Sequence, residues 1–161
     1  MCIRDRFHTE KEKNEDIEIL GLIKNKREIR WIDSSFIEEH DNLNKWKVII
    51  PKSNGSGAIG EILSTPLVGK PLMGYTQSFI GIGAFNEHIE ALAALKYIKS
   101  KFARTLLGIL KVTQDNSKET WRFVPIQNFT ENSDIEWNKS ISEIDQQLYE
   151  NIILQMKKLH L

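Results

Sequence analysis

The sequence is poor in cysteine, proline and glycine. It contains one cysteine, Cys2, four prolines and nine glycines among 161 residues. A single thiol cannot form an intramolecular disulfide or supply a cysteine-rich metal site. The four histidines are scattered and show none of the paired spacings typical of zinc sites. The sequence therefore predicts no disulfide and no metal centre, and the composition is not that of a disordered chain.

Long hydrophobic runs and an excess of either charge are also missing. No apolar run approaches the ~20 residues needed to cross a bilayer, and no secretory signal begins the sequence. We therefore expect a cytoplasmic protein without a membrane partner. The 22 Lys and Arg balance 22 Asp and Glu, which argues against nonspecific coating of nucleic acid but not against a local basic footprint. With 40% hydrophobic residues, the chain can form one domain with a core.

Three parts are expected along the chain. Residues 1–16 lack periodicity and are predicted to be an unstructured leader. A cloning or sequence-assembly artefact is one explanation for this segment. Residues 17–150 form the main domain, and residues 151–161 form a divergent or truncated tail. The predicted fold class is mixed α/β (α+β), with a mixed or antiparallel sheet, one long helix that breaks or bends, and a C-terminal amphipathic helix over 140–159.

Alternating apolar residues predict the strands. Residues 17–23 and 28–33 form a hairpin around a polar turn, and Asp33 caps a short helix ending before Asn42. A buried strand over 46–50 stops at Pro51, because proline cannot donate to the ladder.

The second half of the chain continues this pattern. Pro66 and Pro71 bracket an irregular or edge segment. Further strands are predicted over 75–84 and 120–124.

A long helical pattern follows Asn86, its predicted N-cap, with a break near Ser100 or Gly108. At 100° per residue the apolar and the cationic side chains fall on opposite faces. The apolar face is predicted to comprise Ala91, Leu95, Ile98, Phe102, Leu106 and Ile109, and the cationic face Lys96, Lys101, Arg104 and Lys111.

The cationic face suggests a polyanion as partner. From Lys96 to Arg122 there are seven basic residues and two acids, an excess of five in a chain whose net charge is zero. A solvated helix face usually interleaves acids with bases, whereas no acid lies between Lys96 and Lys111. We therefore favour DNA contact over plain solvation. The predicted phosphate contacts are Lys96, Lys101, Arg104 and Lys111, and the side chains able to contact or stack on bases are Thr76, Gln77, Ser78, Gln114, Asn116, Trp121 and Arg122.

A glycine-rich loop follows the strand over 46–50. Residues 55–60 match the spacing G-x-G-x-x-G, but Pro66 prevents the long helix that a dinucleotide site requires, and Ile80 stands where a ribose-binding acid belongs. Such a loop can instead bring backbone N–H groups to a phosphate, and a mobile surface loop is the open alternative. Its predicted DNA-binding residues are Lys52, Ser53, Asn54, Gly55, Ser56 and Gly57.

Catalytic residues are not expected in this chain. A nuclease needs clustered carboxylates with a lysine, and Asp16, Glu28 and Arg30 of the hairpin do not meet that requirement. An adenine methyltransferase needs an Asn/Asp-Pro-Pro-aromatic loop, and no proline here follows Asn or Asp.

Several segments together carry a resemblance to a known family. In order and spacing, the chain between residues 17 and 150 resembles the C-terminal target-recognition region of bacterial restriction-modification adenine methyltransferases, including fused Type II restriction endonucleases. The segments that carry the resemblance are residues 46–57, 59–61, 69–71, 75–79, 82–85, 96–104, 113–116, 124–129 and 145–149.

The resemblance implies sequence-specific recognition of double-stranded DNA. It implies a parent enzyme whose upstream domain binds S-adenosylmethionine, and magnesium where a nuclease is fused, while this chain itself needs no cofactor. A restriction endonuclease module, and an assembly module docking on a methyltransferase subunit through the Leu/Ile face, remain alternatives.

Overall fold

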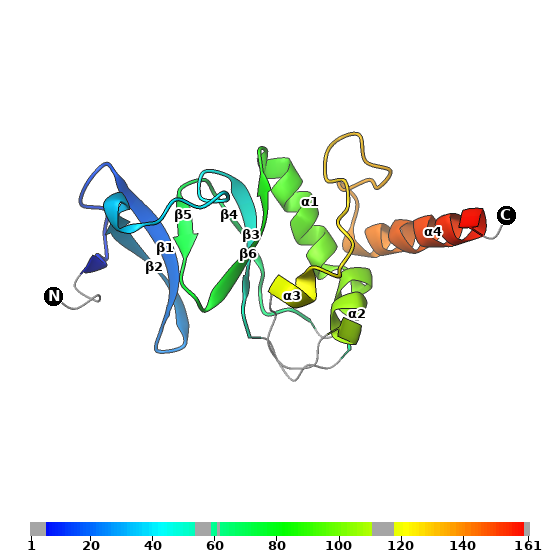
Figure 1. Ribbon diagram of the computed structural model, residues 1–161, viewed down its shortest axis with the longest axis horizontal. Helices are drawn as coiled ribbons and strands as arrows, with labels where there is room; N and C mark the ends of the chain where they lie inside the picture. The colour runs from blue at the N-terminus through cyan, green and yellow to red at the C-terminus, as the bar shows by residue number, and fades with distance from the viewer. Residues whose placement is uncertain (1–5, 54–58, 61, 111–117, 160–161) are drawn as a thin grey trace.

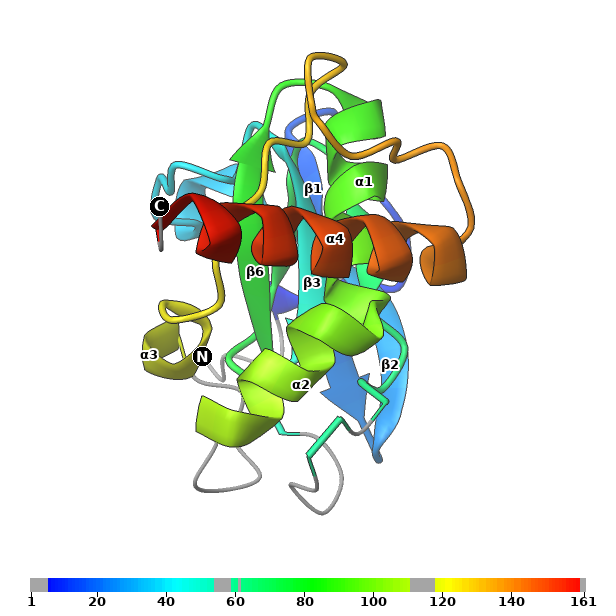
Figure 2. The same cartoon turned by 90° about the vertical axis from the view of Figure 1, so that its right-hand side faces the viewer.

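The computed structural model describes residues 6–53, 59–60, 62–110 and 118–159, which form an α+β fold (Figure 1). One three-stranded sheet has the order β2-β1-β5, and a second has the order β4-β3-β6. Helices α1, α2 and α4 lie on the far side of the second sheet, so the two sheets and the helices follow one another across the molecule (Figures 1 and 2). This confirms the predicted mixture of helices and sheet.

The predicted hairpin is confirmed. Strands β1 (Asp16–Ile23) and β2 (Lys26–Asp33) pair antiparallel along their whole length. Lys24 and Asn25 make the turn with φ of 49° and 61°, so two residues reverse the chain where the pattern suggested four. After β2, Asp33 caps a 3₁₀ turn at Ser34–Phe36, which is shorter than the predicted helix.

The first sixteen residues are not wholly unpacked, so that prediction is wrong for residues 7 and 8. His8 exchanges backbone hydrogen bonds with Trp31 at 2.8 and 2.9 Å, adding a bridge to the open edge of β2. Phe7 packs against a small buried cluster formed by Ile17, Ile19 and Ile32. The sequence pattern did not predict this contact, because residues 9–16 are a polar, mixed-charge run and a single bridge has no periodicity to detect.

Strand β3 (Trp46–Pro51) is the buried centre of the second sheet, as predicted. It pairs antiparallel with β4 (Leu67–Gly69), the short edge strand between the two prolines, and with β6 (Phe79–Phe85).

The prediction of a single strand over residues 75–84 is wrong. β5 (Met73–Tyr75) runs parallel to β1 in the first sheet, and β6 belongs to the second. A turn at residues 76–78, closed by the Phe79 N–H on the Thr76 carbonyl, carries the chain between sheets.

The long helix breaks at Ser100, one of the two predicted positions. α1 (His88–Lys99) ends there, and α2 (Lys101–Leu110) begins at the next residue. The N-cap is Glu87 and not Asn86, and the Glu90 carboxylate accepts the Glu87 N–H at 3.2 Å. The break changes the helical register, which is why the predicted Ile109 is exposed while Leu107 is buried.

The end of the chain is helical. The strand predicted over 120–124 is wrong, because α3 (Lys118–Trp121) occupies its start and Val124 packs into the helical core from an irregular segment. α4 (Ile141–Leu159) is confirmed and begins with a capping box between Ser140 and Glu143. The predicted tail boundary at residue 150 falls inside α4.

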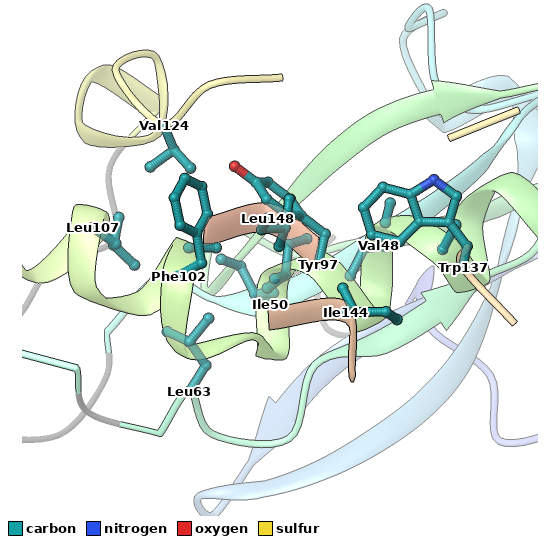
Figure 3. Packing of buried hydrophobic residues seen from close by; sticks show 14 of the residues in the cluster. Val48, Ile50, Leu63, Tyr97, Phe102, Leu107, Val124, Trp137, Ile144 and Leu148 are labelled. Atoms are coloured by element: carbon teal, nitrogen blue, oxygen red, sulfur yellow. The ribbon is translucent and has the colours of Figure 1, made fainter. Parts of the chain in front are cut away.

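The main core lies between the second sheet and the helices (Figure 3). Tyr97 sits among Phe102, Phe129 and Trp137, with ring centroids 5.8 to 6.3 Å from its own. Its hydroxyl donates to the Pro125 carbonyl at 2.7 Å, and burial raises the pKa of Tyr97 to about 12. A smaller cluster of Leu20, Ile49, Met73 and Phe79 lies between the sheets.

Candidate nucleic-acid interface

Two of the side chains predicted to contact phosphates, Lys96 and Arg104, are instead hydrogen-bonded to backbone carbonyls. The Lys96 ammonium donates to the carbonyls of Trp137 and Lys139, both at 2.8 Å. The Arg104 guanidinium donates to the carbonyls of Lys99 and Ser100 at the end of α1 and to that of Gly60 at 2.7 Å. These cations hold the helices to neighbouring loops, so the face predicted from periodicity is not a set of free charges.

The remaining predicted helix residues are separated. Lys101 is exposed beside α4, and Arg122 is exposed beyond α3 with its guanidinium 4.8 Å from the Phe123 ring centroid. Trp121 is half-buried and packs against the main core, which leaves less of its ring for stacking on a base. The other predicted residues lie outside the described part of the chain: Asn54, Gly55, Ser56, Gly57, Lys111, Gln114 and Asn116.

The second predicted group comes together at one edge of the molecule. The Lys52 N–H donates to the Ser78 carbonyl at 2.9 Å, which places the end of β3 against the turn of residues 76–78. Lys52 and Gln77 are exposed, and Thr76 and Ser78 are half-buried. Ser53 follows Lys52 at the same edge. At Gly60, the positive φ of 75° places the residue in a turn, and residues 62–66 contain no helix.

The β1–β2 hairpin lies beside this group, a neighbour that the sequence pattern did not predict. The Thr76 N–H donates to the Leu20 carbonyl at 2.9 Å, so the turn of residues 76–78 begins beside β1, three residues before that strand ends. Lys24, Asn25 and Lys26 at the tip are exposed. The turn between β1 and β2 lies at the lower edge of the view in Figure 1. The signal in the sequence was the basic turn of residues 24–27 itself.

Arg27 fixes the tip against the body. Its guanidinium donates to the carbonyls of Thr65 at 2.5 Å and Ser64 at 2.9 Å, and it lies 5.6 Å from the ring centroid of the buried Phe79. The hairpin, the segment before β4 and the start of β6 are thereby joined. We call residues 24–27, 52–53, 64–65 and 76–78 the basic edge.

The charges of the basic edge are all of one sign. It contains three lysines and one arginine and no acid, and none of the three lysines forms an ion pair with a described residue. Some cations elsewhere in the described chain are paired with carboxylates, as in Lys13 with Asp33 and Lys70 with Glu18. A group of cations without a carboxylate partner among the described residues, beside exposed polar side chains, is chemically suited to a polyanion.

Other parts of the described surface offer less chemistry. A pocket of about 530 Å³ between α1 and residues 129–138 has apolar walls that include Phe129 and Trp137. Among the described residues, no group of three or more His, Cys, Asp or Glu side chains could hold a metal ion. No described helix is long and apolar enough to cross a membrane.

Comparison with protein-family models, curated proteins and solved structures finds no match to this chain.

Proposed function

We propose that this chain recognises double-stranded DNA through the basic edge, as the target-recognition part of a bacterial restriction-modification enzyme with adenine-specific methyltransferase activity. The observation that carries the proposal is the presence, in a chain with zero net charge, of Lys24, Lys26 and Lys52 at an edge whose named residues include no acid, with no ion pair from these lysines to a described residue. The order and spacing of residues 17–150 support the choice of family.

The chemistry of the edge supports a duplex as its partner. Lysine ammonium groups bind phosphates as point charges, and release of counterions from DNA makes such contacts favourable at low salt. Gln77 presents an exposed amide next to these cations, within the same turn that contacts Lys52. Amides form specific hydrogen bonds with base edges. Exposed Lys101 and Arg122 are further candidates for backbone contacts.

The rest of the proposed enzyme lies outside this sequence. An upstream domain would bind S-adenosylmethionine and perform the methyl transfer, and a fused nuclease would use magnesium. A cytoplasmic location, where bacterial DNA is found, belongs to the same proposal.

The salt dependence of binding to a labelled duplex tests the proposal. If about six phosphates are contacted, log K against log salt has a slope of about −5 for the wild-type chain. The variant with Lys24, Lys26 and Lys52 all changed to Ala loses about three contacts, so its slope becomes less negative by about 3. A slope near zero for the wild type overturns the proposal.

A charge-matched control separates the edge from total charge. The variant with Lys13, Lys70 and Lys139 changed to Ala removes the same charge from lysines that are already paired with carboxylates. It retains the wild-type slope to within about one unit if the basic edge is the binding surface. Equal losses in both triple variants would show that binding depends on net charge alone, against the proposal.

The two alternatives are an assembly module and an endonuclease module. An assembly module would expose the apolar stripe of the long helix, but Phe102 is buried, and Leu95 and Leu106 pack against the main core. An endonuclease module would bring carboxylates together, and the described residues contain no such cluster.

A further inference from the structure

The β1–β2 hairpin extends beyond the body of the protein at the basic edge. Leu20 is 3% exposed, whereas Leu22 and Ile23, the last residues of the same strand, are 45% and 38% exposed. In Figure 1 the hairpin extends below the turn between β5 and β6. Two apolar side chains and the turn therefore project into solvent.

The turn at the tip is conformationally defined. Both Lys24 and Asn25 adopt positive φ, and asparagine tolerates this region better than most residues. Ile23 pairs with Lys26 and Leu22 with Arg27, so the strands remain in register up to the turn. Asn25 is thus held at the apex between two lysines.

The hairpin is also braced near its tip and midway along β1. Arg27 donates to the Ser64 and Thr65 carbonyls, and the Leu20 carbonyl accepts the Thr76 N–H. Its position relative to Lys52 is fixed through the turn of residues 76–78, so binding at the tip requires little reordering.

We propose that this hairpin enters the major groove of the duplex and that Asn25 recognises an adenine. The inference rests on the proposed function. The major groove, about 12 Å wide, admits a two-stranded β-ribbon whose strands are about 4.8 Å apart. A side-chain amide offers one donor and one acceptor, which match N7 and N6 of adenine.

The neighbours of Asn25 fit the same placement. Lys24 and Lys26 flank the apex and face phosphates on the two sides of the groove. The exposed Leu22 and Ile23 are apolar and suit contact with a thymine methyl group, which lies only in the major groove.

Selection of bound sequences from a random duplex library tests the role of Asn25. Asn25→Gly removes the amide and retains the positive φ, so the turn is preserved. The wild-type chain is expected to select a site with a fixed adenine, and Asn25→Gly is expected to lose discrimination at that position by roughly 5- to 150-fold. Asn44→Gly, in an exposed turn away from the edge, is the control and retains the wild-type preference.

Replacement of the fixed adenine by 7-deazaadenine identifies the groove. This base lacks the N7 acceptor in the major groove and still pairs with thymine. Wild-type binding should weaken, whereas Asn25→Gly should bind both duplexes equally. An unchanged selected sequence for Asn25→Gly, or wild-type indifference to the 7-deaza base, overturns the assignment of Asn25 and leaves the proposed function standing. Absence of any wild-type duplex binding overturns the proposed function itself.

Discussion

The carboxylate of Asp145 on α4 accepts the backbone N–H of Phe102 on α2 at 2.9 Å, and its other oxygen accepts the N–H of Lys101 at 3.0 Å. Ser100, the residue just before α2, caps the Ala103 N–H at 3.1 Å and donates its hydroxyl to the Tyr97 carbonyl, while Asp145 accepts the two preceding N–H groups. A buried residue more than forty positions away therefore satisfies the first turn of α2 and joins it to α4.

Replacement of Asp145 is expected to destabilise the protein. Asp145→Ala leaves two N–H groups of α2 without acceptors in a buried site and should lower the free energy of unfolding by about 2 to 4 kcal/mol. Asp145→Asn keeps one acceptor and should have a smaller effect. Urea unfolding followed by circular dichroism measures both. Gln146→Ala, on the exposed side of α4, is the control, and an equal effect there would contradict the capping role.

Because of Lys47, we expect the stability of the protein to depend on pH in an unusual way. Its side chain is fully buried on β3, and the ammonium donates to the carbonyls of Asn42 at 2.6 Å and Leu43 at 3.1 Å. It forms no ion pair with a carboxylate in the described part of the chain. Desolvation lowers the pKa of Lys47 to about 8 from 10.5 in the unfolded chain. Between these values the unfolded state binds more protons, so stability rises with pH.

The expected increase in the free energy of unfolding is large enough to measure. From about pH 7 to about pH 9.5, the free energy of unfolding should increase by about 2 kcal/mol through this residue. Urea unfolding at both pH values, compared between the wild type and Lys47→Met, isolates the effect because the variant lacks the titrating group. A wild-type curve parallel to that of the variant would show that Lys47 is not desolvated in this way.

Lys96 is predicted to be structural. Its two hydrogen bonds to the Trp137 and Lys139 carbonyls tie α1 to the segment before α4. Lys96→Met should lower the free energy of unfolding by about 1 to 3 kcal/mol, while Lys99→Met, an exposed residue of the same helix, changes it little. A stable Lys96→Met variant with weakened DNA binding would instead restore Lys96 to the role that periodicity suggested.

The difference between prediction and structure has a physical basis. Local patterns were sufficient for the hairpin, for β3 and for α4, because each depends on periodicity and turn residues within a few positions. Periodicity could not show that the chain changes sheets at residues 76–78, since an apolar strand looks alike in either sheet.

The basic edge was only half predictable for a related reason. Lys52 and Gln77 were expected to bind DNA from their own segments, whereas Lys24 and Lys26 join them only through pairing of distant strands. Similarly, the roles of Lys96 and Arg104 depend on carbonyls that tertiary structure places within reach. Sequence spacing indicates which side of a helix a cation occupies but not which acceptor it meets.

Gly81 on β6 provides a last test, of the contact between the two sheets. A Cβ atom built there would lie against the Tyr75 hydroxyl and 2.8 Å from the Asn42 side-chain nitrogen, and these two groups are hydrogen-bonded to each other at 3.2 Å. Gly81→Ala should therefore lower the free energy of unfolding by about 1 to 3 kcal/mol through overpacking. Tyr75→Phe removes the hydroxyl. In a double-mutant cycle, Gly81→Ala should therefore destabilise the Tyr75→Phe variant by at least about 0.5 kcal/mol less than it destabilises the wild type. Additive effects in urea unfolding would show that the two sheets do not meet at this point.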